Sequence, residues 1–295
     1  MRIRLRSPWF AVRALAVLVA AGCAAPGPAP KPITVSDVTL FGEMDCYRIE
    51  TASAIYVFGK RGAGFASILD PEGKDWISFH PGGKAAGEYR GLPKCGQPVK
   101  YFHCGYGYGQ YRTDAPFTTR VTLQEPDHVR ITSETGDGAS ASDWDFRPTY
   151  ATLTLRRIAL PTYWFLYEGA PGGQLDAEHD QAIRPGGKRT PLSEAWEDQV
   201  PWTCVTSSRT PYALLLISHE PQAQAASYVS WPYAPDPEGG YRQMTILGWG
   251  RPGWKDPAQH QPQFRSLPAR FSIALIRETD EPELDRKARD IRRMP

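Results

Sequence analysis

The chain has 295 residues, 12% of them aromatic, and it contains 27 glycines and 28 prolines. Lys and Arg total 34 and Asp and Glu total 32, but four arginines and no acidic residue precede Cys23. Beyond that position 30 basic residues face 32 acidic ones, a net charge of −2. No polyanion-binding surface follows from this balance, so nucleic acid is not an expected partner.

The first 23 residues have the layout of an export signal. Three arginines within the first six residues precede an apolar run over 14–21, and small residues lead directly to Cys23. A basic start and a short apolar segment are typical of a cleaved signal, whereas a membrane span needs about 20 apolar residues. Small residues before a cysteine are similar to the bacterial lipobox, in which the thiol is acylated. The sequence therefore predicts a lipoprotein signal over 1–23 with Cys23 lipidated, or ordinary cleavage nearby.

This signal places the protein in the cell envelope, exported and lipid-anchored in the outer membrane or facing the periplasm. Residues 24–35 are rich in Pro and Ala, and such a stretch is an extended tether that cannot pack. Residues 36–295 are expected to form a single domain, a length that is routine for a β-sandwich.

Four cysteines follow Cys23, and an even number in an oxidising compartment indicates disulfides. Cys95 and Cys104 flank a Gly/Pro-rich segment and are the expected local bridge. The alternative is that some of the four are buried free thiols. No CxxC motif occurs, so a zinc site is not predicted.

Short β-rich segments separated by Gly and Pro turns recur along the chain. The Asp-Pro-Glu-Gly sequence at 70–73 and Glu-Pro-Asp at 125–127 are typical of hairpin turns. The apolar run over 213–217 indicates a strand that is buried on both faces. One helix is expected at the end, capped by Asp280. The predicted strands cover residues 46–50, 55–58, 64–69, 76–79, 120–123, 129–133, 152–157, 163–167, 212–218, 228–231, 244–249 and 270–277.

This pattern predicts an all-β fold, a large antiparallel β-sandwich with one short C-terminal helix. A propeller or solenoid is not expected, because no internal repeat of fixed period is present.

The start of the domain carries a distinctive series of short strands and glycine turns. The segments that form it are residues 47–51, 55–58, 62–65, 67–70, 73 and 75–77. They resemble the first hairpins of the galactose mutarotase-like supersandwich, which aldose epimerases share with domains of several polysaccharide lyases, and they are similar to secreted proteins of environmental bacteria. Glu220-Pro-Gln222 is similar to the short string that carries the base of aldose epimerases. The resemblance implies a supersandwich fold and a sugar ligand. The two-histidine signature of the epimerases has no counterpart here.

Residues 80–111 combine Gly, Pro, aromatic and ionisable residues without periodicity. A loop of this length inside a compact domain is usually functional. Aromatic rings stack on the C–H face of a pyranose, and charged side chains bind its hydroxyls or a uronate carboxylate. The alternative is a Gly-rich, disulfide-pinned cover over one end of the sandwich.

Within this segment we predict a site for β-elimination. His103 and Tyr106 would act as base and acid, and Arg90 would neutralise the carboxylate beside the proton that is removed. Hydrolysis would instead need two carboxylates roughly 5–9 Å apart. For that reaction Glu88 is the candidate, together with Glu168 or Glu220.

His219 ends a buried strand next to Glu220, and strand ends border sites in sandwiches, so His219 is a further catalytic candidate. The residues predicted to contact substrate are His80, Tyr89, Tyr108, Trp231 and Trp249. His128 and His260 are expected to be solvated. His179, among the acidic residues of 176–180, is expected to lie in an exposed polar turn.

The sequence thus predicts an exported carbohydrate-active protein that acts on a polysaccharide or oligosaccharide, as a uronate-directed lyase or a glycosidase. The alternatives are a non-catalytic glycan-binding envelope lipoprotein and a structural envelope protein without a ligand. A glycan is the expected partner of a monomeric chain that touches the membrane only through its lipid anchor. No cofactor is predicted, and a structural calcium ion is left open.

Overall fold

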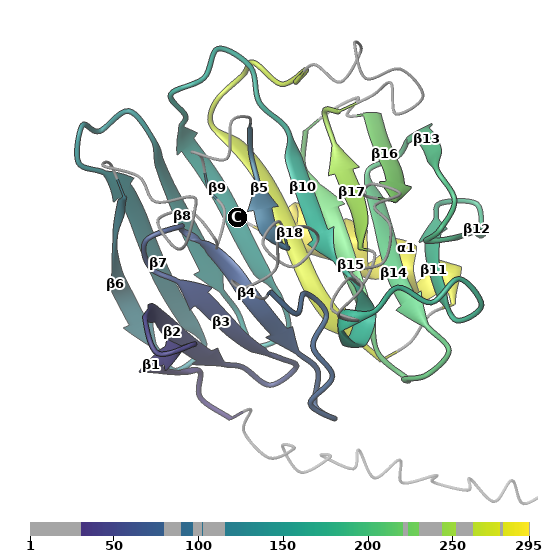
Figure 1. The fold of residues 1–295 in the computed structure, drawn as a ribbon, viewed down its shortest axis with the longest axis horizontal. Helices are drawn as coiled ribbons and strands as arrows, with labels where there is room; N and C mark the ends of the chain where they lie inside the picture. Colours follow the sequence, from purple (N-terminus) through teal and green to yellow (C-terminus); the bar gives the residue numbers. More distant parts are fainter. Residues whose placement is uncertain are drawn as a thin grey trace, which may run out of the picture.

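The protein folds as two large antiparallel β-sheets that lie face to face, as the computed structural model shows (Figure 1). The residues that the structure describes are 31–79, 90–96, 102, 116–220, 224–229, 244–251, 262–277 and 280–294. The prediction of an all-β sandwich with a C-terminal helix is confirmed. Among the described residues, no helix is long and apolar enough to cross a membrane.

The first sheet has the strand order β1-β2-β3-β4-β5-β10-β17-β16-β13. Its strands are β1 (Thr34–Leu40), β2 (Met44–Glu50), β3 (Ile55–Gly59), β4 (Gly64–Leu69), β5 (Gly91–Lys94), β10 (Phe165–Gly169), β13 (Trp196–Gln199), β16 (Gln224–Val229) and β17 (Thr245–Trp249).

The second sheet has the order β12-β11-β14-β15-β18-β9-β8-β7-β6. Its strands are β6 (Phe117–Glu125), β7 (His128–Thr135), β8 (Ala141–Phe146), β9 (Ala151–Arg157), β11 (Asp180–Arg184), β12 (Lys188–Pro191), β14 (Trp202–Ser207), β15 (Ala213–Ser218) and β18 (Ala269–Ile276). A short 3-10 turn, η2 (Pro171–Gly173), follows β10.

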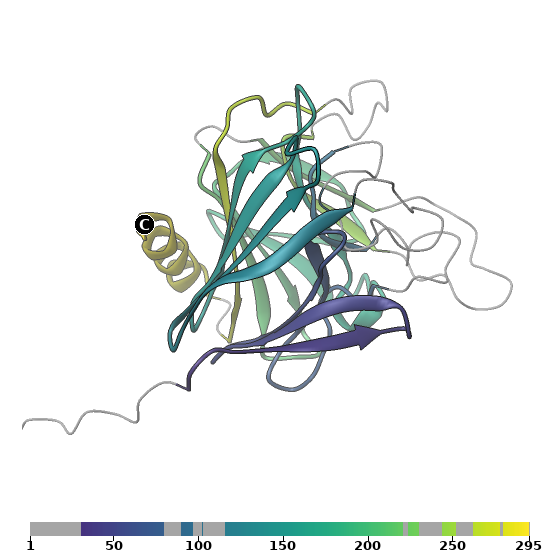
Figure 2. The ribbon, with the colours of Figure 1, turned by 90° about the vertical axis from the view of Figure 1, so that its left-hand side faces the viewer.

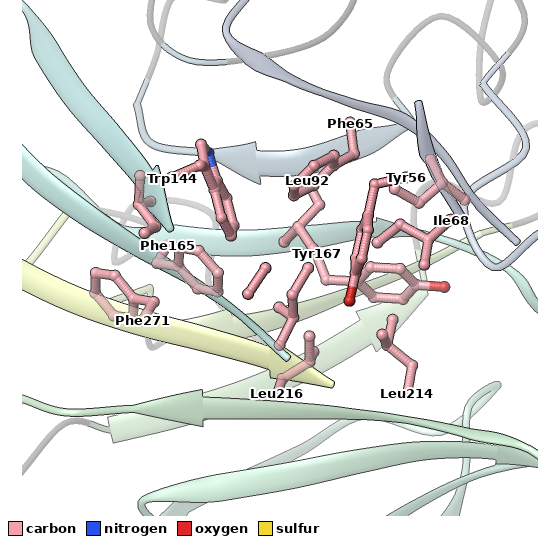
Figure 3. Packing of buried hydrophobic residues seen from close by; sticks show 14 of the residues in the cluster. Tyr56, Phe65, Ile68, Leu92, Trp144, Phe165, Tyr167, Leu214, Leu216 and Phe271 are labelled. Atoms are coloured by element: carbon pink, nitrogen blue, oxygen red, sulfur yellow. The ribbon is translucent and has the colours of Figure 1, made fainter. Parts of the chain in front are cut away.

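The core between the sheets is rich in aromatic side chains (Figure 3). Phe65 of the first sheet meets Trp144 of the second with ring centroids 4.6 Å apart, and Phe165 stacks on Phe271 at 4.2 Å. All four side chains are fully buried. Burying one such side chain stabilises the fold by about 1.5–3 kcal/mol, and favourable ring geometry adds to that. The core therefore holds the two sheets in a fixed relative position.

The helix α1 (Glu281–Arg293) lies against the outer face of the second sheet (Figure 2). Its first turn is capped as predicted, because the carboxylate of Asp280 accepts a hydrogen bond from the backbone N–H of Glu283 at 2.9 Å. The buried side chains of this contact are Leu284, Ala288 and Ile291 of the helix and Trp202, Leu215, Ile217 and Ala274 of the sheet.

The strand prediction is incomplete, since it lacks β1, β8, β11, β12, β13 and β14, and two further parts of it are wrong. The segment 76–79 is not a strand, because Ser78 adopts the left-handed backbone conformation (φ 57°), which ends an extended run. Residues 91–94, which were assigned to a long loop, form β5, and their Leu92 side chain is fully buried in the core. The functional loop that we predicted over 80–111 is therefore interrupted by a central strand.

The predicted bridge from Cys95 is also wrong. Cys46, Cys95 and Cys204 are buried free thiols. Burial raises the pKa of the Cys46 thiol to about 12 and raises those of the Cys95 and Cys204 thiols further, so these groups stay protonated and unreactive at neutral pH. Cys104 lies outside the described residues.

Candidate functional site

A buried charge pair marks the outer face of the first sheet, where β5, β10 and β17 run side by side (Figure 1). Along β10, Phe165 and Tyr167 belong to the core between the sheets. Because side chains alternate along a strand, Leu166 and Glu168 point to the opposite, outer face. Lys94 of β5 pairs in register with Leu166 and joins Glu168 on that face.

The ammonium Nζ of Lys94 donates a hydrogen bond to Oε1 of Glu168 at 3.0 Å. Glu168 is fully buried and Lys94 is only 5% exposed. Removing two charges from water costs several kcal/mol per ion, and their attraction offsets that cost only when their geometry is good. Such pairs are therefore uncommon in a plain structural role, and buried charge partners cluster at functional sites.

An apolar patch lies on the same face beside the pair. Trp164, Leu166, Met244 and Ile246 form a buried cluster of their own, separate from the main core. The guanidinium of Arg251 lies over the Trp164 ring, 4.7 Å from its centroid. Aromatic and apolar surface next to a few directed polar groups is the usual lining of a small-molecule site.

Glu168 was one of the carboxylates that we proposed for hydrolysis, so the sequence found half of this pair. A single acidic residue inside the apolar run Trp-Phe-Leu-Tyr-Glu-Gly is the signal that marks it. Lys94 was not assigned a role, because its partnership with Glu168 depends on the pairing of β5 with β10, which are 74 residues apart in the chain. Arg251 was missed because its contact with Trp164 also joins segments that are far apart in the chain.

Arg90 lies just before β5 and holds the backbone of two turns. Its Nη1 donates hydrogen bonds to the carbonyl of Gly173 at 2.8 Å and to that of Ser78 at 3.3 Å. The side chain is only 4% exposed. These contacts tie the turn after β10 to the segment after β4, whereas the predicted role in neutralising a uronate stays a prediction.

Trp249 is a core residue. Its side chain is fully buried, its indole N–H donates to the carbonyl of Val200 at 2.8 Å, and its ring packs near Phe165. A ring that stacks on a sugar needs an open face, so the burial of Trp249 contradicts the predicted substrate contact.

His219 follows β15 and lies on the outer face of the second sheet, away from Glu168. Its Nε2 is 2.8 Å from the hydroxyl of Ser272, which in turn is 2.8 Å from the hydroxyl of Thr152. Glu220 accepts a hydrogen bond from the backbone N–H of Arg270 at 3.0 Å. The contacts given above for Arg90, Trp249 and His219 involve different residues, so the described part of the chain does not bring these three side chains together.

The remaining predicted site residues lie outside the described residues. They are Cys23, His80, Glu88, Tyr89, His103, Tyr106, Tyr108 and Trp231. The predictions for these positions stay predictions.

Two of the other histidines are described. His128 is 8% exposed and its Nε2 lies 2.6 Å from Oδ1 of Asp145, so the prediction that it is solvated is wrong. His179 is exposed, as predicted, and its Nδ1 lies 2.7 Å from the hydroxyl of Ser208. Within the described part of the chain, no three or more His, Cys, Asp or Glu side chains are grouped as metal ligands would be.

The stability of the protein should fall as the pH drops from about 6.5 to 4, because of His219. Burial, assisted by the charges of Arg270 and Arg292, lowers the pKa of this imidazole to about 4. In the unfolded chain its pKa is about 6.5, so between these values the unfolded state binds the proton more readily. The expected loss is at most roughly 3 kcal/mol across that range.

Urea denaturation at pH 7, 5.5 and 4 measures this loss. His219→Gln should flatten the dependence, since glutamine does not titrate, whereas His179→Gln, at an exposed histidine, should leave it as in the wild type. An equally steep pH dependence in His219→Gln would show that another group is responsible.

No protein-family model matches the chain, and no curated protein matches its sequence. Solved structures do resemble it. The protein HI1317 has a TM-score of 0.52 and 12% sequence identity, and the match covers 82% of this chain and 100% of that one. A galactose mutarotase-like protein from Clostridium acetobutylicum has a TM-score of 0.49 and 7% identity, covering 84% of this chain and 99% of that one. The likeness to HI1317 shows a shared fold.

Proposed function

We propose that the chain is a carbohydrate-active protein that acts on a polysaccharide or oligosaccharide, with Glu168 as its base and Lys94 as the cation that stabilises developing charge. The observation that carries this proposal is the buried ion pair on the outer face of the first sheet, 3.0 Å between Nζ and Oε1.

Elimination from a uronate is the reaction that this pair fits best. The carboxylate of Glu168 would take the C5 proton, and the ammonium of Lys94 would stabilise the charge that develops on the uronate carboxylate. The C–H electron pair then forms the C4–C5 double bond as the C4–O bond breaks. The departing oxygen takes a proton from an acid or from water, which balances the reaction.

Hydrolysis is less well supported by the contacts. A glycosidase needs a second carboxylate across the scissile bond. Among the described residues, Glu168 accepts a hydrogen bond from Lys94, a cation, and Glu220 is bonded to the backbone of the second sheet; the other predicted carboxylate, Glu88, lies outside the described residues. A non-catalytic glycan-binding protein, which would hold a sugar without any turnover, is the alternative.

The proposal includes the location that the sequence predicts. Export through the signal over 1–23 and a lipid on Cys23 would place the domain in the cell envelope, where acidic polysaccharides are accessible to it. The domain would then reach its substrate from the Pro/Ala tether, which was predicted over 24–35 but ends before residue 33, because Ile33 is buried and Thr34 begins β1.

Glu168→Gln tests the role of the carboxylate, because glutamine keeps the size of the side chain but cannot accept the proton. Uronate polymers incubated with the wild type should yield unsaturated products that absorb in the ultraviolet, and the variant should lose at least about 100-fold in rate. Glycan affinity, measured by titration calorimetry, should change little.

Glu197→Gln is the matched control, since it makes the same change at an exposed position of β13 in the same sheet. Its rate should equal that of the wild type. Equal rates in Glu168→Gln and the wild type would remove Glu168 from the mechanism. Binding without product in the wild type would favour the non-catalytic alternative.

A further inference from the structure

The outer face of the second sheet carries two adjoining hollows that the proposed reaction does not use. One has a volume of about 260 Å³ and lies over β7, β8, β9 and β18; the other, of about 380 Å³, lies over β6 to β9. Arg130 lines both, so the two hollows adjoin, and the pair is called the trough. The trough is on the opposite side of the sandwich from Glu168.

Positive charge predominates in this trough. Five arginines and three carboxylates line its two hollows. The arginines are Arg120, Arg130, Arg147, Arg156 and Arg270, and the acidic residues are Glu134, Asp143 and Asp145. The excess is local, because the chain beyond Cys23 has more acidic than basic residues.

All three carboxylates already have partners. Asp145 Oδ1 lies 2.6 Å from Nε2 of His128 and accepts from Arg130 at 2.8 Å. Asp143 pairs with Arg156 at 2.9 Å. Glu134 pairs with Arg157.

Arg147 and Arg270 have no such partner. Neither forms an ion pair with a carboxylate of the described residues, although one N–H of Arg270 donates to the carbonyl of Met294 at the end of α1 at 3.0 Å. Both guanidinium groups line the 260 Å³ hollow together with Tyr150. Guanidinium groups bind carboxylates and sulfates through paired N–H donors, so two of them in one hollow are suited to an anionic ligand.

The positive charges of these arginines also act on the pKa values of two neighbouring groups, His219 and Tyr150. Burial is the largest cause of the lowered pKa of His219, and the positive charges of Arg270 and Arg292 lower it further. Burial raises the pKa of Tyr150, and Arg147 and Arg270 oppose that rise.

We propose that this trough is a second, non-catalytic binding site for a stretch of acidic glycan. Carboxylates or sulfates on the sugars would bind Arg147 and Arg270, and sugar hydroxyls would bind Thr152 and Thr154, which line the same hollow. Because the two hollows lie next to each other, together they fit several consecutive sugars better than one small anion. The arginines of the trough indicate that the ligand is anionic, whereas the inference that this ligand is a glycan rests on the proposed function.

Arg147→Glu tests this site by reversing one of the two available charges. Titration calorimetry with polygalacturonate oligomers should show at least a 10-fold loss of affinity, and Arg147→Lys should retain most of it. Neutral dextran of the same length should bind the wild type and Arg147→Glu with equal affinity. Binding of the oligomers should weaken as salt is raised from 0.02 to about 0.15 M, where charges are screened beyond about 8 Å.

Arg189→Glu is the matched control, because it reverses an exposed arginine on β12, at the opposite edge of the same sheet from β6. Its affinity should equal that of the wild type. Equal affinity in Arg147→Glu, or an equal loss in Arg189→Glu, would overturn the site. Inorganic phosphate that binds as tightly as the polymer would also overturn it, because the trough would then hold a small anion.

The two proposals can fail separately. If Glu168→Gln abolishes turnover while its polymer affinity still depends on Arg147, both stand. If Glu168→Gln leaves turnover unchanged but Arg147→Glu weakens the polymer complex, the trough stands without the proposed reaction.

Discussion

Replacing Lys94 with methionine should lower the free energy of unfolding by about 3–5 kcal/mol at pH 7, because the buried Glu168 loses its ammonium partner. The carboxylate is fully shielded from water, so solvent cannot take over the role of Nζ. The change should appear as a lower midpoint in urea denaturation, with an unchanged slope if the unfolded state stays the same.

The double variant Lys94→Met with Glu168→Leu distinguishes a lost partner from lost packing. It should recover most of the stability, since an apolar pair of similar volume needs no desolvation of charge. Arg286→Met, in the exposed pair with Glu283 on α1, is the control and should change stability little. If Lys94→Met were as stable as the wild type, the pair would not be buried as the structure has it.

Much of the fold could be predicted from alternation of apolar and polar residues. The segments at 46–50, 64–69 and 270–277 were found because each has a buried face to reveal it. The edge strands β1 and β12 were not found, since most of their side chains are exposed and their sequences resemble loops. An edge strand is stabilised mainly by backbone hydrogen bonds to its neighbour, and these bonds do not require a particular pattern of side chains.

The candidate site was only partly predictable. Glu168 is conspicuous in its apolar strand, but the sequence does not indicate which face of the sheet it occupies or that Lys94 lies beside it. Trp249 was misjudged as a substrate contact because the sequence does not show that β17 lies between β10 and β16 inside the sheet. Contacts between segments far apart in the chain decide such cases, and local patterns do not contain them.

Gly248→Ala should destabilise the protein by about 3 kcal/mol or more, because β10 and β17 approach each other too closely there for a side chain. An added Cβ would lie 2.0 Å from the carbonyl oxygen of Phe165 and 2.8 Å from the Cα of Leu166. Both are backbone atoms of β10, so no rotamer change can make room. The strands must separate, and the displaced strand is the one that carries Glu168.

Gly136→Ala is the matched control, because an added Cβ there meets nothing within 4 Å. Thermal unfolding should show a large drop in Tm for the first variant and almost none for the second. Hydrogen exchange should accelerate at the amides of Leu166 and Glu168 in Gly248→Ala, and its loss of turnover should accompany that change. If the two alanine variants were equally stable, β10 and β17 would not be in the close register that sets Glu168 beside Ile246, and the geometry of the proposed Glu168–Lys94 pair would have to be abandoned.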